Sequence, residues 1–147
     1  QQQLGKKQEI AAAQMKEIDA IYKGKEATAK MAYEQSGLCA DDIDAAVIYD
    51  AFTPIVLWQL ESWGFCDLLG APKFVLDGAM RSDGRLPTNT HGGQLSEAYI
   101  HGVNGIVEAT RLVRGQSVNQ PAKEVNNVLV TSGVGVPTGG ALLGRPD

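Results

Sequence analysis

Apolar positions along the chain alternate between helical spacing and short continuous runs, which predicts an α/β fold. Residues 6–36 carry a partial helical stripe, and we expect a helix there that is broken near Gly24 and ended by Gly37. A polar turn at 40–44 then precedes an apolar run at 45–49. Such a run after a turn is typical of a strand buried on both faces.

The middle of the chain predicts two further helices separated by loops. We expect Thr53 to cap a helix that ends at Gly64. Residues 64–86 contain several turn pairs and predict loops around a short strand at 73–76. A longer helix is expected over residues 96–114.

One face of the helix expected at 96–114 is predicted to be buried. Its members recur at spacings of four and three: Tyr99, Val103, Ile106, Thr110 and Val113. Gly102 and Gly105 lie near this face, although glycine inside a helix costs about 0.5–1 kcal/mol relative to alanine. Close packing against another backbone is the expected compensation.

The last part of the chain predicts a β-hairpin. Strand-like residues at 125–131 and 141–144 flank a glycine-rich turn at 132–140. Together with the strand at 45–49, this order predicts a mixed β-sheet with helices packed on it.

Composition and charge narrow the range of partners. The net charge of −4 gives no indication of a nucleic acid or an anionic membrane as partner. No apolar run approaches the roughly 18 residues of a membrane span, and the N-terminus lacks the apolar core of a secretory signal. Because no initiator methionine is present, we expect a fragment or a processed product. We expect one domain at 25–147, preceded by a helical or linker segment at 1–24 whose first residues are frayed.

The two cysteines, Cys39 and Cys66, do not have the spacing of a metal site, and no metal is predicted. Each lies beside an apolar residue, so we interpret both as small buried hydrophobes rather than nucleophiles. Lone thiols without a secretory signal are typical of the reducing cytoplasm, where we place the protein.

Chemically versatile residues concentrate at 86–105. Both histidines of the chain, His91 and His101, lie there, and Gly92 and Gly93 stand directly after the first. Paired glycines let a backbone approach a ligand, and a following helix start offers free N–H donors. The alternative is a glycine turn that merely caps an ordinary helix.

Three loops beside the predicted strands carry polar or glycine residues, at 49–53, 89–99 and 132–140. We expect them to converge at one end of the sheet, which is a common plan for an active site.

In this order the loops resemble the C-terminal half of a thiolase. That family has an Asn-Glu-Ala-Phe or His-Asp-Ala-Phe motif after a strand. An Asn-x-x-Gly-Gly segment follows, leading to Gly-His-Pro at a helix start, and a glycine-rich hairpin comes last. The matching residues here are 49–52, 89–105 and 133–140, and the resemblance covers about 25–147.

Departures from the thiolase pattern suggest a subgroup. The family's catalytic histidine falls on Tyr99, and the Asn or His of the first motif falls on Tyr49. The last glycine loop has no counterpart of the second thiolase cysteine, and the nucleophilic cysteine of the family belongs to the N-terminal half. The two tyrosines resemble the lipid-transfer-protein-like thiolases of the sterol carrier protein X type. Some of these are retro-aldolases that cleave steroid side chains as CoA thioesters.

The resemblance implies proton transfer by two tyrosines. Retro-aldol cleavage of a β-hydroxyacyl-CoA needs a base for the hydroxyl proton, stabilisation of the thioester oxygen, and an acid for the enolate. We assign Tyr99 as the base and Tyr49 as the acid or enolate contact, and the reverse assignment stays open. His91 could hydrogen-bond the oxyanion or tune a tyrosine. For a lone tyrosine, a place in the core is the alternative interpretation.

Substrate and CoA contacts are expected at polar and glycine positions: Asp50, Asn89, Gly92, Gly93, Gly139 and Gly140. Gly92 and Gly93 would bring backbone N–H groups toward the thioester. Asp50 would orient its loop, or cap a helix. Coenzyme A would enter as part of the substrate, and no covalently bound cofactor is expected.

Two other functions stay open beside the aldolase. A thiolase half would carry out acyl transfer with the cysteine of the other half, and a non-catalytic carrier would bind acyl-CoA or lipid. The resemblance implies an N-terminal thiolase half, a thiolase-type homodimer and a small acyl-CoA-binding protein with an OB-fold and a zinc ribbon as partners. We expect this chain to be inactive by itself.

Overall fold

The computed structural model describes residues 2–97, 100, 102–133 and 138–145. The helices are α1 (Gln2–Ser36), α2 (Thr53–Ser62), α3 (Ala71–Leu76) and α4 (Val103–Val113), with a short 3-10 turn, η1, at Ala40–Asp42. The strands are β1 (Ala45–Val47), β2 (Asn127–Ser132) and β3 (Gly139–Gly144).

The strands form a mixed sheet, as the sequence predicts. Their order in the sheet is β1-β2-β3. β1 pairs with β2 in parallel, with Ala45 opposite Val128. β2 and β3 form the expected hairpin, with Ser132 opposite Gly139. Beyond β1, Thr88 makes a single parallel bridge to Ala46, so the segment that enters the 89–97 loop also lies along the sheet.

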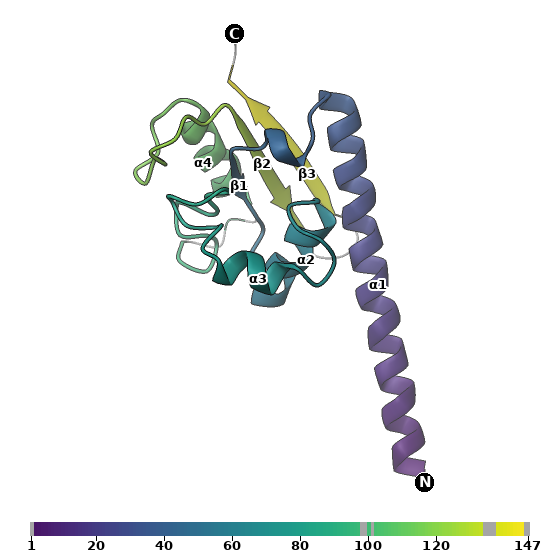
Figure 1. The fold of residues 1–147 in the computed structure, drawn as a ribbon. Helices are drawn as coiled ribbons and strands as arrows, with labels where there is room; N and C mark the ends of the chain where they lie inside the picture. The colour runs from purple at the N-terminus through teal and green to yellow at the C-terminus, as the bar shows by residue number, and fades with distance from the viewer. Residues whose placement is uncertain (1, 98–99, 101, 134–137, 146–147) are drawn as a thin grey trace.

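Helices cover both faces of this sheet, which explains why the sequence of β1 is continuously apolar (Figure 1). Side chains alternate between faces along each strand. On β1, Ala46 belongs to a core cluster with residues of α1 and α2, including Leu60 and Trp63. Its neighbours Ala45 and Val47 belong to a second cluster with residues of α4.

α1 is continuous from Gln2 to Ser36, so the predicted break near Gly24 and the frayed start are wrong. A single glycine costs a helix only about 1 kcal/mol, and the flanking Lys, Glu, Gln and Ala residues have high helix propensity. The N-terminal part of α1 extends away from the rest of the molecule (Figure 1), and its apolar side chains there, such as Ile10 and Met15, are exposed. Within the described residues, neither α1 nor any other helix is long and apolar enough to cross a membrane.

The strand predicted at 73–76 is wrong, because these residues belong to α3. The first turn of α3 contains Pro72, which is pre-organised for that position. The short apolar run at 73–76 could not be distinguished from a strand by periodicity alone.

α4 begins at Val103, several residues later than predicted. Gly102 adopts a φ of 92° at the N-cap, so the helix cannot extend back through it in the right-handed conformation. The predicted face is wrong at Val103 and Ile106, which are exposed, and right at Val113, which is buried, as are Ala109 and Leu112. Gly105 lies on the buried side, where an added Cβ would come within 3.1 Å of Val47. Close packing at this glycine is therefore confirmed, although against a side chain.

The predictions for the helix ends and for the burial of the cysteines are confirmed only in part. Gly37 and Gly64 end α1 and α2 in left-handed conformations, as predicted. Thr53 is not the cap of α2, because Phe52 occupies the N-cap without a side-chain hydrogen bond. Cys39 is exposed, which corrects the prediction of a buried thiol, and Cys66 is half-buried against the core.

We predict that Gly140→Ala will lower the free energy of unfolding by about 1–3 kcal/mol, as overpacking does. An added Cβ would lie 2.5 Å from two ring carbons of Trp63, which is buried. Gly139→Ala is the matched control, because no heavy atom lies within 4 Å of its added Cβ, and we expect it to stay within about 0.5 kcal/mol of wild type. Urea unfolding of both variants measures the difference, and equal stabilities would contradict the packing of Trp63 on β3.

Candidate functional site

The site begins where β1 ends and its backbone leaves the sheet. Beyond Val47, the backbone groups of Ile48 and Tyr49 are buried, and such groups require hydrogen-bond partners. Side chains from other segments supply them, which fixes the chain direction at the expected first loop.

Asn89 satisfies both backbone groups of Ile48. Its Oδ1 accepts from Ile48 N at 2.8 Å, and its Nδ2 donates to Ile48 O at 3.0 Å. Asn89 N also donates to Ala46 O at 2.9 Å. Its φ of 51° is left-handed, a conformation that asparagine tolerates better than most residues. Asn89 therefore acts as a one-residue extension of the sheet that joins the second loop to the first.

Thr131 and Gln59 hold the backbone of Tyr49. Tyr49 N donates to Thr131 Oγ1 at 2.9 Å, and Gln59 Nε2 donates to Tyr49 O at 2.7 Å. Thr131 Oγ1 donates in turn to Gln59 Oε1 at 2.5 Å. Tyr49 itself is 8% exposed. These contacts join β2 and α2 to the end of β1 at Tyr49, the residue that is predicted to transfer a proton.

Asp50 holds the paired-glycine turn. Its Oδ1 accepts from Gln94 N at 2.9 Å, and an added Cβ on Gly93 would overlap its carboxylate. Gly92 and Gly93 both have left-handed backbones, with φ of 103° and 74°. The N–H of Gly92 donates to Asn89 O at 2.8 Å and so closes the turn.

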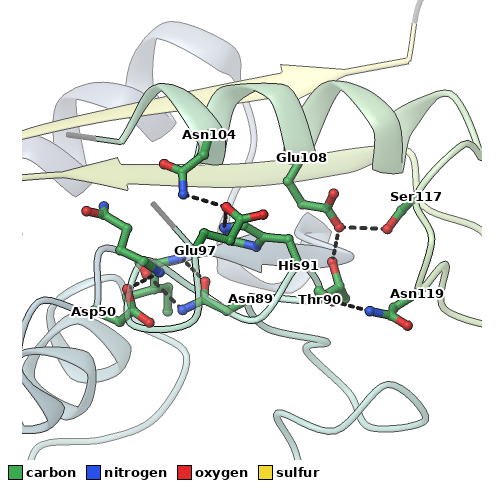
Figure 2. A network of polar contacts seen from close by, with 11 residues as sticks. Asp50, Asn89, Thr90, His91, Glu97, Asn104, Glu108, Ser117 and Asn119 are labelled. Atoms are coloured by element: carbon green, nitrogen blue, oxygen red, sulfur yellow. Dashed lines mark hydrogen bonds and ion pairs between the residues drawn. The ribbon is translucent and has the colours of Figure 1, made fainter. Parts of the chain in front are cut away.

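His91 is buried between this turn and α4 (Figure 2). Its side chain is 6% exposed, and Nε2 lies 3.8 Å from Glu97 Oε2, an ion pair only when the imidazole is protonated. Within the described chain, neither ring nitrogen has a hydrogen-bond partner, nor do Gln94 Oε1 and Asn104 Oδ1. Buried polar atoms without partners are uncommon, so their concentration here indicates a place where a ligand or water binds.

Glu108 of α4 anchors the residue before His91. Its Oε1 accepts from Thr90 Oγ1 at 2.5 Å and from Ser117 Oγ at 2.6 Å, and Asn119 Nδ2 donates to Thr90 O (Figure 2). Glu108 is 3% exposed, and a buried carboxylate needs such donors. The Glu108 contacts therefore fix the start of the second loop on the helix that follows it.

The first two loops converge as predicted, whereas none of the residues described in the third loop, at 132–133 and 138–140, lines the cavity that they form. Tyr49, Asp50 and His91 line one narrow cavity together with Gln94 and Thr131. His91 also lines a wider pocket of about 360 Å³ on the outer side, with Glu97, Asn104, Glu108 and Arg111. His91 thus stands between the inner cavity and the outer pocket.

Some predicted site residues are not placed in this cavity. Tyr99 and His101 lie outside the described residues. Gly140 packs on Trp63, and Gly139 stands in open space at the start of β3. Among the side chains that the structure describes, no three of the His, Cys, Asp and Glu type are arranged to hold a metal ion.

Chemically, the cavity offers a phenol, an imidazole and a carboxylate. Cys66 lies in the core cluster of α1 and α2, where burial raises the pKa of its thiol to about 11. A thiol with that pKa is almost fully protonated at neutral pH and is a poor nucleophile. The cavity residues therefore suit proton transfer and hydrogen bonding.

Three polar residues that bear on the site were not predicted: Lys25, Gln59 and Glu108. Each is buried on its helix four positions before a buried core residue: Ala29, Trp63 and Leu112 respectively. A charged or amide side chain at the spacing of a core stripe is the signal that could have found them.

We predict that Gly93→Ala will destabilise the fold by about 1–3 kcal/mol more than Gly37→Ala. Both glycines are left-handed, with φ of 74° and 72°, so alanine pays a similar backbone cost of about 1–2 kcal/mol at each. Only at Gly93 does the added Cβ meet another group, the Asp50 carboxylate, since nothing lies within 4 Å at Gly37. Chemical denaturation of the two variants tests this, and equal losses would show that Asp50 does not press on the glycine turn.

Two known proteins and one solved structure are similar to this chain. A protein of Thermomonospora curvata named "Steroid side-chain-cleaving aldolase" is 64% identical over 112 residues, covering 76% of this chain and 28% of that protein. The "17-hydroxy-3-oxo-4-pregnene-20-carboxyl-CoA lyase" of Mycobacterium tuberculosis is 58% identical over 112 residues, with 76% and 29% covered. This chain thus spans less than a third of the length of these relatives.

A solved structure, described as "Ltp2-ChsH2(DUF35) aldolase", superimposes with a TM-score of 0.79 at 60% identity, covering 82% of this chain and 31% of that one. The family model described as "Thiolase C-terminal domain-like" matches residues 6–142. This match, over the mixed sheet and the two convergent loops, shows that the chain belongs to the thiolase C-terminal domain-like family.

Proposed function

We propose that this chain supplies the C-terminal part of the active site of a thiolase-fold lyase. The reaction is retro-aldol cleavage of a β-hydroxyacyl-CoA, with a steroid side chain as the acyl group, to a ketone and a short acyl-CoA. One observation carries the proposal. A buried tyrosine, Tyr49, is held through both its backbone N–H and its C=O where the thiolase pattern has Asn or His.

The relatives support this reaction. Two proteins at 58% and 64% identity are named as a CoA lyase and a steroid side-chain-cleaving aldolase. Their matched segments share the region of Tyr49, and a retro-aldol reaction needs no cysteine nucleophile.

The mechanism moves two protons. A base removes the proton of the β-hydroxyl group, the C–C bond breaks to give the ketone, and its electrons form the enolate of the short acyl-CoA. An acid then protonates the enolate carbon. We assign Tyr99 as base and Tyr49 as acid or enolate contact, with the roles interchangeable. His91 would hydrogen-bond the thioester oxygen or a tyrosine, for which its unpartnered nitrogens are available.

Six further residues are proposed as contacts of the substrate and its CoA part: Asp50, Asn89, Gly92, Gly93, Gly139 and Gly140. The first two act by holding the loops in place, since their side chains already bind Gln94 N and the backbone of Ile48. An added Cβ at Gly93 would overlap the Asp50 carboxylate, so any larger residue would displace both.

The proposed assembly includes an N-terminal thiolase half, a homodimer and a small acyl-CoA-binding protein with an OB-fold and a zinc ribbon, in the cytoplasm. The similar solved structure is described as an Ltp2-ChsH2(DUF35) aldolase, which supports a second protein component. The chain alone is expected to be inactive.

The test assembles the chain with an N-terminal thiolase half and the OB-fold protein and supplies a β-hydroxyacyl-CoA with a steroid acyl group. Mass spectrometry should detect a ketone and a short acyl-CoA, and alkylation of cysteines should leave the rate intact. Cleavage of a 3-ketoacyl-CoA by free CoA would instead indicate a thiolase. Tight acyl-CoA binding without turnover of either substrate would indicate a carrier.

We predict that Tyr49→Phe and Tyr99→Phe will each lower kcat by about 10²–10⁴-fold with little change in KM, the usual size of a general acid–base contribution. Tyr22→Phe is the control, because Tyr22 lies away from the cavity, in a separate groove between α1 and α2. Steady-state kinetics on the assembled enzyme measures the three variants. If both site variants kept wild-type kcat, the tyrosine mechanism would be excluded.

A further inference from the structure

Lys25 of α1 is buried, with 1% of its surface exposed. Lysine is almost never fully buried unless its ammonium group is paired, because removing the charge from water is costly. No step of the proposed reaction uses this residue. Its position therefore requires an explanation from its contacts.

The ammonium group of Lys25 joins three parts of the fold. Nζ donates to Gln59 Oε1 of α2 at 3.3 Å, to Gly133 O at 3.1 Å and to Thr138 Oγ1 at 3.2 Å. Gly133 directly follows β2 and Thr138 directly precedes β3. Lys25 thus holds both ends of the third loop, and it uses all three of its donors.

Gln59 continues these contacts to the predicted proton-transfer residue. Its Oε1 accepts from both Lys25 Nζ and Thr131 Oγ1, while its Nε2 donates to Tyr49 O. An amide that accepts through one end and donates through the other has a fixed orientation. Lys25 and Thr131 together therefore fix which way Gln59 presents its donor to Tyr49.

We propose that Lys25 is a positioning residue, whose ammonium group fixes the ends of the third loop and, through Gln59, the backbone of Tyr49. The link to catalysis rests on the proposed function of Tyr49. The structural part, which concerns the loop ends and the Tyr49 amide, can be measured without any substrate.

Burial also lowers the pKa of Lys25, which gives the stability a measurable dependence on pH. All three acceptors are uncharged, and desolvation lowers the pKa of Lys25 to about 8. Glu26 of α1 and Glu61 of α2 line a separate groove together with Tyr22. Because the folded pKa lies below that of the unfolded chain, the unfolded state binds more protons above pH 8. The contribution of Lys25 to the free energy of unfolding therefore rises with pH between about 8 and 10.5.

The test replaces Lys25 with methionine, which is similar in length but cannot donate a hydrogen bond. Lys30→Met is the matched control, because Lys30 lies on the same helix with a side chain 76% exposed and pairs with Glu34 at the surface. Hydrogen exchange of the full chain should show protection falling about 10-fold, the effect of about one lost hydrogen bond, near Gly133 and Thr138 in Lys25→Met alone. The amide resonance of Tyr49 should shift in the same variant.

The thermal stability of the Lys25→Met variant distinguishes a positioning role of Lys25 from a purely structural role. Lys25→Met should keep or raise the melting temperature at pH 7, because it removes a buried charge. The rise in stability between about pH 8 and 10.5 should be smaller than in wild type. Cys66 and Lys123 also titrate with shifted pKa values, but they are common to both proteins and cancel in the difference.

In the assembled enzyme, Lys25→Met should lower kcat by about 10- to 100-fold, the size expected for a small misplacement of a reacting group. Combining it with Gln59→Met should lower kcat little further than Gln59→Met alone, since the effect on Tyr49 passes through that amide. Unchanged exchange near Gly133 and an unmoved Tyr49 resonance in Lys25→Met would overturn the proposal. Altered exchange in an assembly that turns over no acyl-CoA would instead uphold the positioning and reject the proposed reaction.

Discussion

The structure around the site depends on one constraint: the backbone of residues 48–49 is buried after it leaves the sheet and must be satisfied by side chains. Asn89, Thr131 and Gln59 do this, each from a different part of the chain. Leaving such a group unpaired costs about 1–3 kcal/mol, so the three segments are held together by the need to avoid that cost. The convergence of the loops follows from this constraint.

The sequence predicted the architecture well where the signals were long or chemically specific. The continuous apolar run at 45–49 indicated a strand covered on both faces, and helices α1, α2 and α4 provide that cover. The pattern at 125–131 indicated a second strand, which is β2. It failed at 73–76, where a short apolar run favours helix and strand equally, and at Gly102, whose left-handed backbone delays α4. The predicted face of α4 was wrong at Val103 and Ile106, because the buried face includes Asn104 and Glu108, which a pattern of apolar spacing excludes.

Part of the candidate site was predictable from the sequence, namely the residues that belong to recognisable motifs. Tyr49, Asp50, Asn89 and His91 stand in motifs, and the structure brings them to one place. Lys25 is remote in sequence from every motif, and only its hydrogen bonds across 108 and 113 positions reveal its connection to the third loop. Residues that position others carry little local signal, because their partners are set by the fold.

The parallel pairing of β1 and β2 has a consequence for the order in which the molecule folds. The β2–β3 hairpin is local and can form early, whereas the bond from Tyr49 N to Thr131 Oγ1 spans 82 positions. Closing so long a loop is entropically costly, and such distant contacts slow folding. Because β1 must join the hairpin before Tyr49 is held, the geometry of the candidate site would be among the last features to appear. A chain arrested before that step would have a nearly complete hairpin and no functional cavity.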